Sequence, residues 1–467
     1  MDLFKIYSML PIPMQNWIVG VYSEKIKAER SGREFEEILE FLKTTDNWGY
    51  KQIVDYKEEH TFKIIEQAYQ HCPYYKKKYD EAGVTPSDFT CLEDLGKFPI
   101  LTKEEIRENY AGMISDNVRA NDRIKYHTSG SSGKALDFLN SKYNLRFYWA
   151  VCARYNLRFG IDLNDSSLNF TGKMVTPIKQ NKPPYWRYKR AQNQYMMPMV
   201  HVTKEKVPSI VDFINSTDIK KIVGYPSIAF SFASFVNELG LKIEKIPKCY
   251  FSGAEKVYEY QQEEIEKAFP GIKIVEHYGF SENAGAASKC VCGEYHEDFE
   301  LGHFELADSI KDGDYETGEL LSTGFHNYAM PFIRYAVGDT LTFDNRPCKC
   351  GLKSQVIHEV NGRNEDYVIT PEGSRIMRFD YLFKDTHEIR EGQVVQRELG
   401  EIVLRLVCRK DYRKEATEKY LVNKVHTLIS PAIRVAFEYV DEIPRTKAGK
   451  FKAVLSEIKH DDKLKGL

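Results

Sequence analysis

The sequence predicts an α/β protein with a large, multi-layered N-terminal domain of mostly parallel sheets and a small α+β domain after it. Apolar, strand-like runs alternate with helical patterns between residues 220 and 280, as they do where right-handed crossovers connect parallel strands. Residues 1–125 show mainly helical spacing of apolar side chains. After Gly362 the pattern changes to hairpins around one helix, so we expect domains of residues 1–362 and 366–467.

Local patterns justify the individual elements. Residues 60–83 have helical spacing, and Thr102 followed by Glu105 predicts a capping box that starts another helix. The parallel sheet is predicted from strands within residues 220–224, 247–254 and 271–280, with helices over 226–239 and 255–269 between them. The C-terminal domain is predicted from hairpins at 367–376 and 392–410, a helix at 411–429 and a strand at 433–443.

Composition and charge exclude several classes of protein. Of the 467 residues, 42% are hydrophobic and 29% charged, which is typical of globular proteins. The 66 Lys and Arg nearly balance the 68 Asp and Glu, and a net charge of -2 disfavours nucleic acid as a partner. Since no apolar run reaches the roughly 18 residues of a membrane span, we expect no transmembrane segment. We expect a cytoplasmic protein.

Two segments admit more than one interpretation. The N-terminal segment lacks the basic start of a secretory signal, and Pro11 and Pro13 interrupt its apolar part. We expect it to pack as an ordinary segment, with a helix on a membrane surface as the alternative. We expect the basic residues of segment 182–190 to form a solvated face, with recognition of phosphates or another anionic acceptor as the alternative.

Four cysteines and one histidine indicate a metal site. Cys290, Cys292 and His296 form one cluster, and Cys348 and Cys350 form a second about 50 residues later. A structural Zn²⁺ site takes four such ligands in a tetrahedral arrangement. Without an export signal, metal binding is favoured over disulfides, and buried free thiols are the alternative.

Segment 126–136, YHTSGSSGKAL, is suited to binding a polyphosphate. Its hydroxyl groups are donors, and its glycines let backbone N–H groups approach an anion. The glycine spacing differs from that of P-loop NTPases, and a flexible surface loop is the alternative. The residues concerned are Thr128, Ser129, Gly130, Ser131, Ser132 and Gly133.

Segment 276–285, EHYGFSENAG, directly follows a predicted strand. Tyr278 is suited to stacking on a base, Ser281 to bonding a phosphate, and Glu282 to holding Mg²⁺. A tight turn in the core is the alternative, since aromatic residues around a glycine suit that equally.

Two further motifs lie nearer the C-terminus. In segment 317–339, the turn at Gly338 presents the carboxylate of Asp339, which suits two ribose hydroxyls but is also a common turn signal. In the basic segment 443–458, Lys450 is suited to reaching a phosphate, with a solvated charge as the alternative.

The four motifs, in this order, resemble the ANL adenylate-forming superfamily, and in particular phenylacetate–CoA-ligase-like proteins of the CapK type. Segment 97–109, KFPILTKEEIREN, also resembles that branch, so the resemblance spans residues from about 97 to 456. It implies the acyl-adenylating fold, in which a small mobile C-terminal domain carries the catalytic lysine.

The resemblance also implies roles for individual residues. The phosphate loop corresponds to residues 128–134, where Lys134 stands in place of a common Thr, and Ser281 likewise replaces a Thr. The adenine pocket corresponds to Ser252, Gly253, Ala254, Glu255, Tyr278 and Gly279. The remaining roles are Glu282 for Mg²⁺, Asp339 for ribose, Arg363 for phosphate, Glu365 as hinge in place of the usual Asp, and Lys450 as catalytic lysine.

For zinc, members of this branch pair a C-x5-H motif with a C-x-C motif. The resemblance therefore implies the ligands Cys290, His296, Cys348 and Cys350, with Cys292 as an extra thiol that competes with His296. The site would be structural and would clip an insertion at about residues 288–351.

The resemblance implies an ATP-dependent ligase that activates a carboxylic acid as acyl-AMP, releases pyrophosphate and passes the acyl group to an acceptor. An amine or hydroxyl in surface-polysaccharide biosynthesis is one expected acceptor, and the thiol of CoA is the alternative. A zinc-clipped binding protein without catalysis is the competing hypothesis, which Glu282, Asp339 and Lys450 disfavour. The acid, the acceptor and the oligomeric state stay open.

Overall fold

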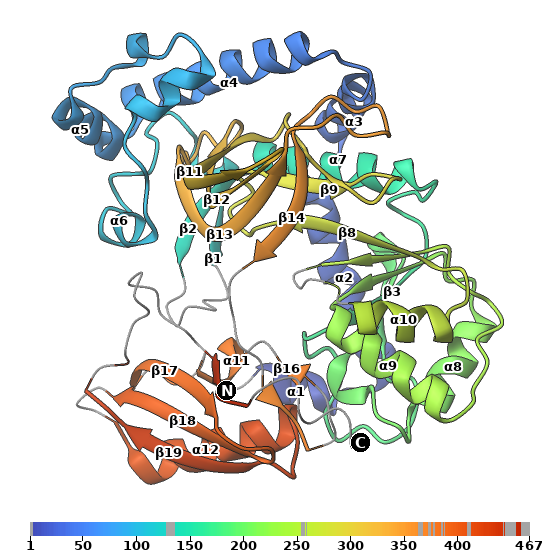
Figure 1. Ribbon diagram of the computed structural model, residues 1–467. Helices are drawn as coiled ribbons and strands as arrows, with labels where there is room; N and C mark the ends of the chain where they lie inside the picture. The colour runs from blue at the N-terminus through green and yellow to red at the C-terminus, as the bar shows by residue number, and fades with distance from the viewer. Residues whose placement is uncertain are drawn as a thin grey trace. The chain divides into compact units, whose positions relative to one another are not determined.

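The chain forms two compact units, Met1–Tyr126 with Phe138–Gly362 and His127–Asp137 with Arg363–Leu467 (Figure 1). The computed structural model describes residues 3–127, 136–253, 257, 259–362, 368–371, 375–376, 379–383, 386, 388–408, 412–441, 443 and 454–458. Each unit is described by itself.

One 12-stranded sheet runs through the first unit, beside a separate two-stranded sheet. The strands of the large sheet are β3 (Ser167–Thr171), β4 (Arg187–Lys189), β5 (Gln194–Pro198), β6 (Lys221–Gly224), β7 (Cys249–Ser252), β8 (Lys273–Gly279), β9 (Ala286–Lys289), β10 (Tyr295–Glu297), β11 (Gly302–Asp312), β12 (Tyr315–Gly324), β13 (Tyr335–Asp344) and β14 (Val356–Gly362). Their order is β11-β12-β13-β14-β10-β9-β8-β7-β6-β3-β5-β4, and β1 (Arg123–His127) pairs with β2 (Asp137–Ser141).

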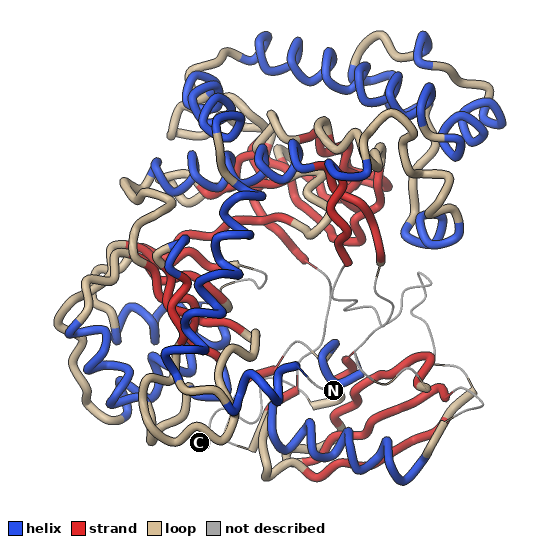
Figure 2. The backbone as a smooth tube through the Cα atoms, turned by 180° about the vertical axis from the view of Figure 1, so that it is seen from behind, coloured by secondary structure: helices blue, strands red, loops and turns tan. Residues whose placement is uncertain are grey.

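The first unit also contains helices, several of which pack against this sheet (Figure 2). They are α1 (Leu3–Met9), α2 (Ile12–Arg30), α3 (Arg33–Thr45), α4 (Tyr50–His71), α5 (Pro73–Ala82), α6 (Lys103–Glu108), α7 (Lys142–Arg158), α8 (Val207–Ser216), α9 (Pro226–Glu238) and α10 (Glu259–Ala268), with short 3₁₀ helices η1 (Pro86–Asp88), η2 (Leu92–Lys97), η3 (Ala120–Asp122), η4 (Arg190–Gln192) and η5 (Met199–His201). The predicted capping box is present, because Thr102 accepts from the Glu105 backbone N–H and Glu105 accepts from that of Thr102.

The predicted strand–helix alternation is confirmed in one half of the sheet. Strands β5, β3, β6, β7 and β8 are parallel neighbours, and α9 and α10 connect the last three. Phe170, Phe232 and Tyr250 are fully buried in the core between this sheet and its helices. Gly224 has a φ of 128°, and a Cβ there would lie 2.0 Å from the carbonyl oxygen of Phe170, so only glycine allows this close approach.

The other half of the sheet differs from the expected mostly parallel arrangement, although the α/β class is confirmed. All neighbouring pairs from β8 through β14 to β11 are antiparallel. The physical reason is that short turns join β9 to β10 and β11 to β12, and a short connection cannot carry the chain back to start a parallel strand.

The second unit contains a four-stranded sheet in the order β19-β18-β17-β20 and a β15–β16 hairpin. Its elements are β15 (Val368–Ile369), β16 (Arg375–Ile376), α11 (Asp380–Phe383), β17 (Ile389–Gln396), β18 (Glu401–Cys408), α12 (Lys414–Leu428), β19 (Arg434–Tyr439) and β20 (Val454–Ser456). The two predicted hairpins, the helix and the strand are all present. Leu421 and Val425 of α12 pack on Val394 and Leu404 of the sheet, which gives this unit its own core.

Within the described ranges, none of the helices combines the length and the apolar character needed to cross a bilayer.

Candidate functional site

Three parallel strands end at the same edge of the first unit. Gly224 ends β6, Ser252 ends β7, and Tyr278 and Gly279 end β8. Ser252 pairs in register with Gly224 on one side and with Glu276 on the other. The carboxyl edge of such a sheet is where ligands bind in open α/β folds, so four predicted adenine-pocket positions share that edge: Ser252, Gly253, Tyr278 and Gly279.

Tyr278 connects this edge to a distant strand of the same sheet. Its phenol donates a hydrogen bond of 2.7 Å to Oδ2 of Asp339, which lies in β13 and is buried. Strands β9, β10 and β14 stand between β8 and β13 in the strand order, so the antiparallel half must curve back over the end of β8. The predicted base-stacking tyrosine and the predicted ribose ligand therefore lie side by side.

A bulge in β13 sets the direction of Asp339. Glu319 of β12 pairs with Thr340 and Leu321 pairs with Ala336, so Leu320 alone faces residues 337–339. Gly338 has a φ of 85°, in the left-handed region that glycine adopts without strain. Bulges of this kind turn a side chain out of the regular strand alternation.

The segment before α6 supports this bulge. Leu101 forms a bridge to Tyr335, and its backbone bonds with Arg334 and Ala336 at 3.1 and 2.9 Å. That contact brings Lys103 over the bulge, where its ammonium donates a 2.7 Å hydrogen bond to the carbonyl oxygen of Val337. Segment 97–109, which resembles one branch of the family, thus has a structural role at β13.

A second tyrosine holds the predicted magnesium ligand. The phenol of Tyr335 donates a 2.5 Å hydrogen bond to Oε1 of Glu282, and both side chains are buried. Glu282 lies in the turn after β8, where Asn283 has a φ of 52° and its carbonyl accepts from the Asn144 amide at 3.2 Å. Ser281, in the same turn, is exposed. The turn thus fixes a buried carboxylate beside an exposed hydroxyl.

The four predicted zinc ligands lie together at the ends of two hairpins. Cys290 follows β9, His296 is in β10, and Cys348 and Cys350 belong to the loop between β13 and β14. One ligand atom from each of the four lies within 4.8 Å of the others. The Sγ atoms of Cys290 and Cys348 are 3.7 Å apart, and Cys350 Sγ lies 3.3 Å from His296 Nε2.

Burial governs the protonation of this cluster. Burial, followed by the charge of Arg158, lowers the pKa of His296 to about 4, so its imidazole is neutral at physiological pH. Neutral imidazole is the form that binds a metal. Burial also raises the pKa of Cys350 to about 12, and slight desolvation with the neighbouring Cys290 and Cys348 raises the pKa of Cys292. Three sulfurs and one ring nitrogen in one place fit the donor set of structural Zn²⁺.

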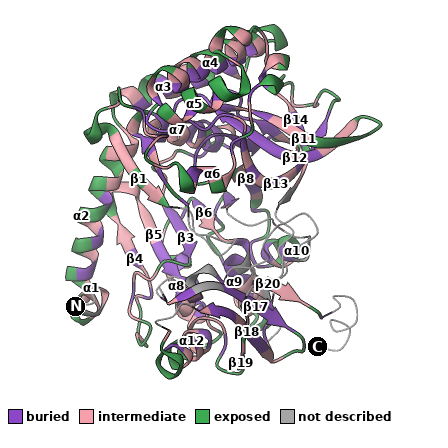
Figure 3. Ribbon diagram, turned by 90° about the vertical axis from the view of Figure 1, so that its left-hand side faces the viewer, coloured by how far each residue is buried: buried purple, intermediate pink, exposed green. Residues whose placement is uncertain are grey.

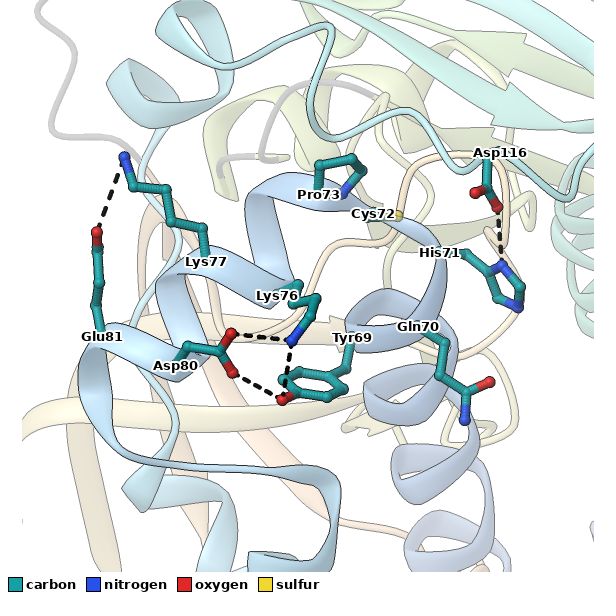
Figure 4. Close-up of a pocket in the computed structure, with 10 residues that line it drawn as sticks. All are labelled: Tyr69, Gln70, His71, Cys72, Pro73, Lys76, Lys77, Asp80, Glu81 and Asp116. Carbon is teal, nitrogen blue, oxygen red and sulfur yellow. Dashed lines mark hydrogen bonds and ion pairs between the residues drawn. The ribbon is translucent and has the colours of Figure 1, made fainter.

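A surface pocket between α4 and α5 contains neither the predicted nucleotide-site residues nor the predicted zinc ligands. It encloses about 470 Å³ and is lined by Tyr69, Gln70, His71, Cys72, Pro73, Lys76, Lys77, Asp80, Glu81 and Asp116 (Figure 4). Its polar groups have partners: Lys76 pairs with Asp80 at 3.0 Å, and Nδ1 of His71 lies 2.8 Å from Asp116. None of the predicted site residues lines it.

Several predicted residues lie outside the described residues. They are the phosphate loop at 128–134, Ala254, Glu255, Arg363, Glu365 and Lys450. Sequence reasoning, in turn, missed Tyr335 and Lys103. Neither has a local signal in the sequence, because the bulge around Gly338 breaks the strand alternation that would otherwise relate Tyr335 to Asp339.

Known proteins are similar to this chain over most of its length. Residues 368–457 match the family described as the CapK C-terminal domain. Protein CapK from Staphylococcus aureus is 24% identical over 458 residues, covering 97% of this chain and 99% of that protein. A phenylacetate-coenzyme A ligase from Thermus thermophilus is 23% identical over 440 residues, covering 85% of this chain and 95% of that protein.

Solved structures show the same fold. A 2-hydroxyisobutyryl-CoA ligase in complex with 2-HIB-AMP and CoA, in the thioesterification state, has a TM-score of 0.61 at 18% identity. The match covers 88% of this chain and 92% of that one. The same ligase in its postadenylation state, in complex with R3-HIB-AMP, has a TM-score of 0.56.

Proposed function

We propose, on the premise that this chain is a CapK-type relative of the phenylacetate-coenzyme A ligases, that it is an ATP-dependent, AMP-forming carboxylate ligase. It activates a carboxylic acid as acyl-AMP and passes the acyl group to an acceptor. The observation that carries this proposal is the hydrogen bond between Tyr278 and Asp339, because it joins two motifs 61 residues apart at the carboxyl edge of the parallel strands.

The reaction needs two anions to meet. A carboxylate oxygen attacks the α-phosphorus of ATP, the bond from that phosphorus to the pyrophosphate oxygen breaks, and pyrophosphate leaves. The acceptor then attacks the acyl carbon, and AMP leaves. Such a site has to hold the nucleotide rigidly and offset its negative charge.

The described residues suit the nucleotide side of this reaction. The ring of Tyr278 offers a face for the adenine, and Ser252 and Gly253 form the neighbouring wall. The buried carboxylate of Asp339 is suited to accepting hydrogen bonds from the two ribose hydroxyls, since the bulge at Gly338 fixes its direction. Mg²⁺ would offset phosphate charge, and Glu282 is the residue that would hold it, because its carboxylate is buried and already oriented by Tyr335.

The remaining roles rest on the resemblance alone. We assign residues 128–134 to the phosphates, Ala254 and Glu255 to the adenine pocket, Arg363 to phosphate contact and Glu365 to the hinge of a C-terminal domain. Lys450 would bridge the reacting carboxylate and the α-phosphate as charge shifts between them.

We assign zinc a structural role. A closed site of Cys290, His296, Cys348 and Cys350 leaves no position for a substrate, and it would tie the β9–β10 turn to the β13–β14 loop. Because β13 also carries Tyr335 and Asp339, the clip would stabilise the strand that completes the nucleotide site.

The acceptor is either an amine or hydroxyl of a surface-polysaccharide precursor or the thiol of CoA. The near full-length similarity to Protein CapK favours the first, and the similarity to coenzyme A ligases favours the second. Either reaction fits the cytoplasm, where ATP is available and thiols stay reduced.

Acid-dependent exchange of labelled pyrophosphate into ATP tests the proposal. The wild-type chain, screened against a panel of carboxylic acids, should exchange with at least one of them, and Lys450→Ala should lose exchange by about 10²-fold or more while still binding ATP. Lys353→Ala, an exposed lysine in the first unit, is the matched control. Full exchange in Lys450→Ala refutes its role, and ATP binding without exchange by the wild type for any acid favours the inactive binding protein.

A further inference from the structure

The N-terminal helices expose an apolar face. Trp17 is 69% exposed and Met9 is 81% exposed, although large apolar side chains usually turn inward. In Figure 3, α2 lies along one margin of the first unit with its exposed side turned outward. The face consists of Ile6, Met9, Met14, Trp17, Ile18, Val21 and Tyr22, which we call the N-terminal apolar face.

The opposite side of α2 buries Gln15, Val19 and Ser23, and its polar groups make specific contacts with the sheet. Oε1 of Gln15 accepts two hydrogen bonds from Arg187, at 2.9 and 2.6 Å. Oδ1 of Asn16 accepts from the backbone N–H of Tyr188 at 3.3 Å, and Oγ of Ser23 accepts from that of Ala191 at 3.2 Å.

These contacts fix how α2 is rotated. The expected solvated position of Arg187 is wrong, because its guanidinium is fully buried and bonds Gln15 and backbone carbonyls. Turning α2 to hide its apolar side would remove the two hydrogen bonds that Arg187 donates to Gln15, and losing a partner of a buried charge is costly. The helix is therefore amphipathic in the reverse sense, with its apolar side held outward.

Charge distinguishes the occupants that such a face can have. No acidic residue occurs from Leu3 to Ser23, and of the three exposed charged residues that follow, Glu24, Lys25 and Lys27, two are cationic. In a symmetric contact between two copies the same cations would meet, whereas an anionic lipid surface offsets them.

We propose that the N-terminal apolar face lies on an anionic lipid bilayer. Met14, Ile18 and Val21 enter the boundary between headgroups and acyl chains, and Trp17 and Tyr22 take the interfacial depth that their amphipathic rings favour. Lys25 and Lys27 contact lipid phosphates. The helix lies in the plane of the surface and holds the first unit against it, and this inference does not depend on the proposed enzymatic function.

Flotation of the full-length chain with vesicles tests the proposal. Vesicles of phosphatidylcholine containing phosphatidylglycerol should carry the chain, and Trp17→Gln with Ile18→Gln should weaken its partitioning by about tenfold or more. Tyr50→Gln with Ile310→Gln is the matched control, since these side chains are 73% and 74% exposed elsewhere on the first unit and should leave partitioning unchanged. Lys25→Gln and Lys27→Gln should each cost about fivefold on these anionic vesicles and nothing on vesicles of phosphatidylcholine alone.

Three results would overturn the proposal: no flotation of the wild type, equal loss in the control, or lysine variants that bind both kinds of vesicle equally well. Sedimentation velocity tests whether a second copy of this chain, instead of a bilayer, covers the N-terminal apolar face. If the Trp17→Gln, Ile18→Gln double variant converts a dimer into a monomer and the wild type does not bind vesicles, the face is a contact between two copies. Circular dichroism of each variant verifies folding.

Discussion

The phenol of Tyr278 donates a 2.7 Å hydrogen bond to the buried carboxylate of Asp339, and this bond joins the end of a parallel strand to the bulge of an antiparallel one. Neither residue is positioned by its own strand alone. The bulge at Gly338 turns Asp339 toward the end of β8, and Tyr278 then restricts the carboxylate to one orientation.

Tyr278→Phe should weaken ATP binding without unfolding the chain. The ring that we propose faces the adenine remains, but Asp339 loses a donor, and a hydrogen bond to a charged group is worth about 1.5–3 kcal/mol. We expect the Kd for ATP, measured by titration calorimetry, to rise by about tenfold. Tyr188→Phe, which removes a phenol bonded to Asn193 at 2.9 Å, should leave the Kd unchanged. Equal Kd values for the two variants would remove Tyr278 from the nucleotide site.

Tyr335→Phe should raise the Mg²⁺ requirement of the reaction. Glu282 then keeps its charge but loses the group that orients it, so we expect the Mg²⁺ concentration for half-maximal pyrophosphate exchange to rise by about three- to tenfold. Excess Mg²⁺ should restore the rate.

Tyr75→Phe is the control for that variant. Its phenol is also fully buried and donates a 2.8 Å hydrogen bond, to the carbonyl oxygen of Pro331. Both variants should lose stability, but only Tyr335→Phe should shift the Mg²⁺ dependence. A merely structural role for Tyr335 predicts that the two behave alike.

Lys103→Met should loosen the bulge in β13. The methionine fills similar space, but the carbonyl of Val337, which the bulge removes from regular strand pairing, loses its donor. We expect the free energy of unfolding, measured with urea, to fall by about 1–2 kcal/mol and the Kd for ATP to rise by about two- to fivefold. In Lys221→Met the lost bonds are to the carbonyls of Asp162 and Leu163, at 3.0 and 3.1 Å and away from the bulge, so stability should fall while the Kd stays the same. A Kd unchanged in Lys103→Met would separate the bulge from nucleotide binding.

What the sequence predicted well is local. The alternation of strands and helices from 220 to 280, the capping box at Thr102 and the hairpin over 389–408 follow from periodicity and turn residues a few positions apart. The spacing of the cysteines, with a family resemblance, likewise singled out four side chains that lie together.

What the sequence missed depends on contacts between distant segments. Tyr335 meets Glu282 across 53 residues, and Lys103 meets Val337 across 234, so no local pattern reports either pair. Arg187 looked solvated because its neighbours are basic, yet Gln15, 172 residues earlier, buries it. The antiparallel half was missed because the expected sheet was extended from the alternation over residues 220–280, which ends before β9 begins at Ala286.

Zinc content separates Cys292 from the other thiols. Purified, reduced protein should contain about one zinc per chain, since the four clustered ligands complete a tetrahedral site. Cys350→Ser should lose that zinc and lower the Tm by about 5 °C or more, because metal binding to the folded state adds directly to stability. Cys292→Ser is the matched control, and because its exposed thiol is not among the four clustered ligands, both zinc content and Tm should match the wild type. Loss of zinc from Cys292→Ser with retention in His296→Ala would instead make Cys292 the fourth ligand, and the absence of zinc from wild type would leave the cluster as free thiols.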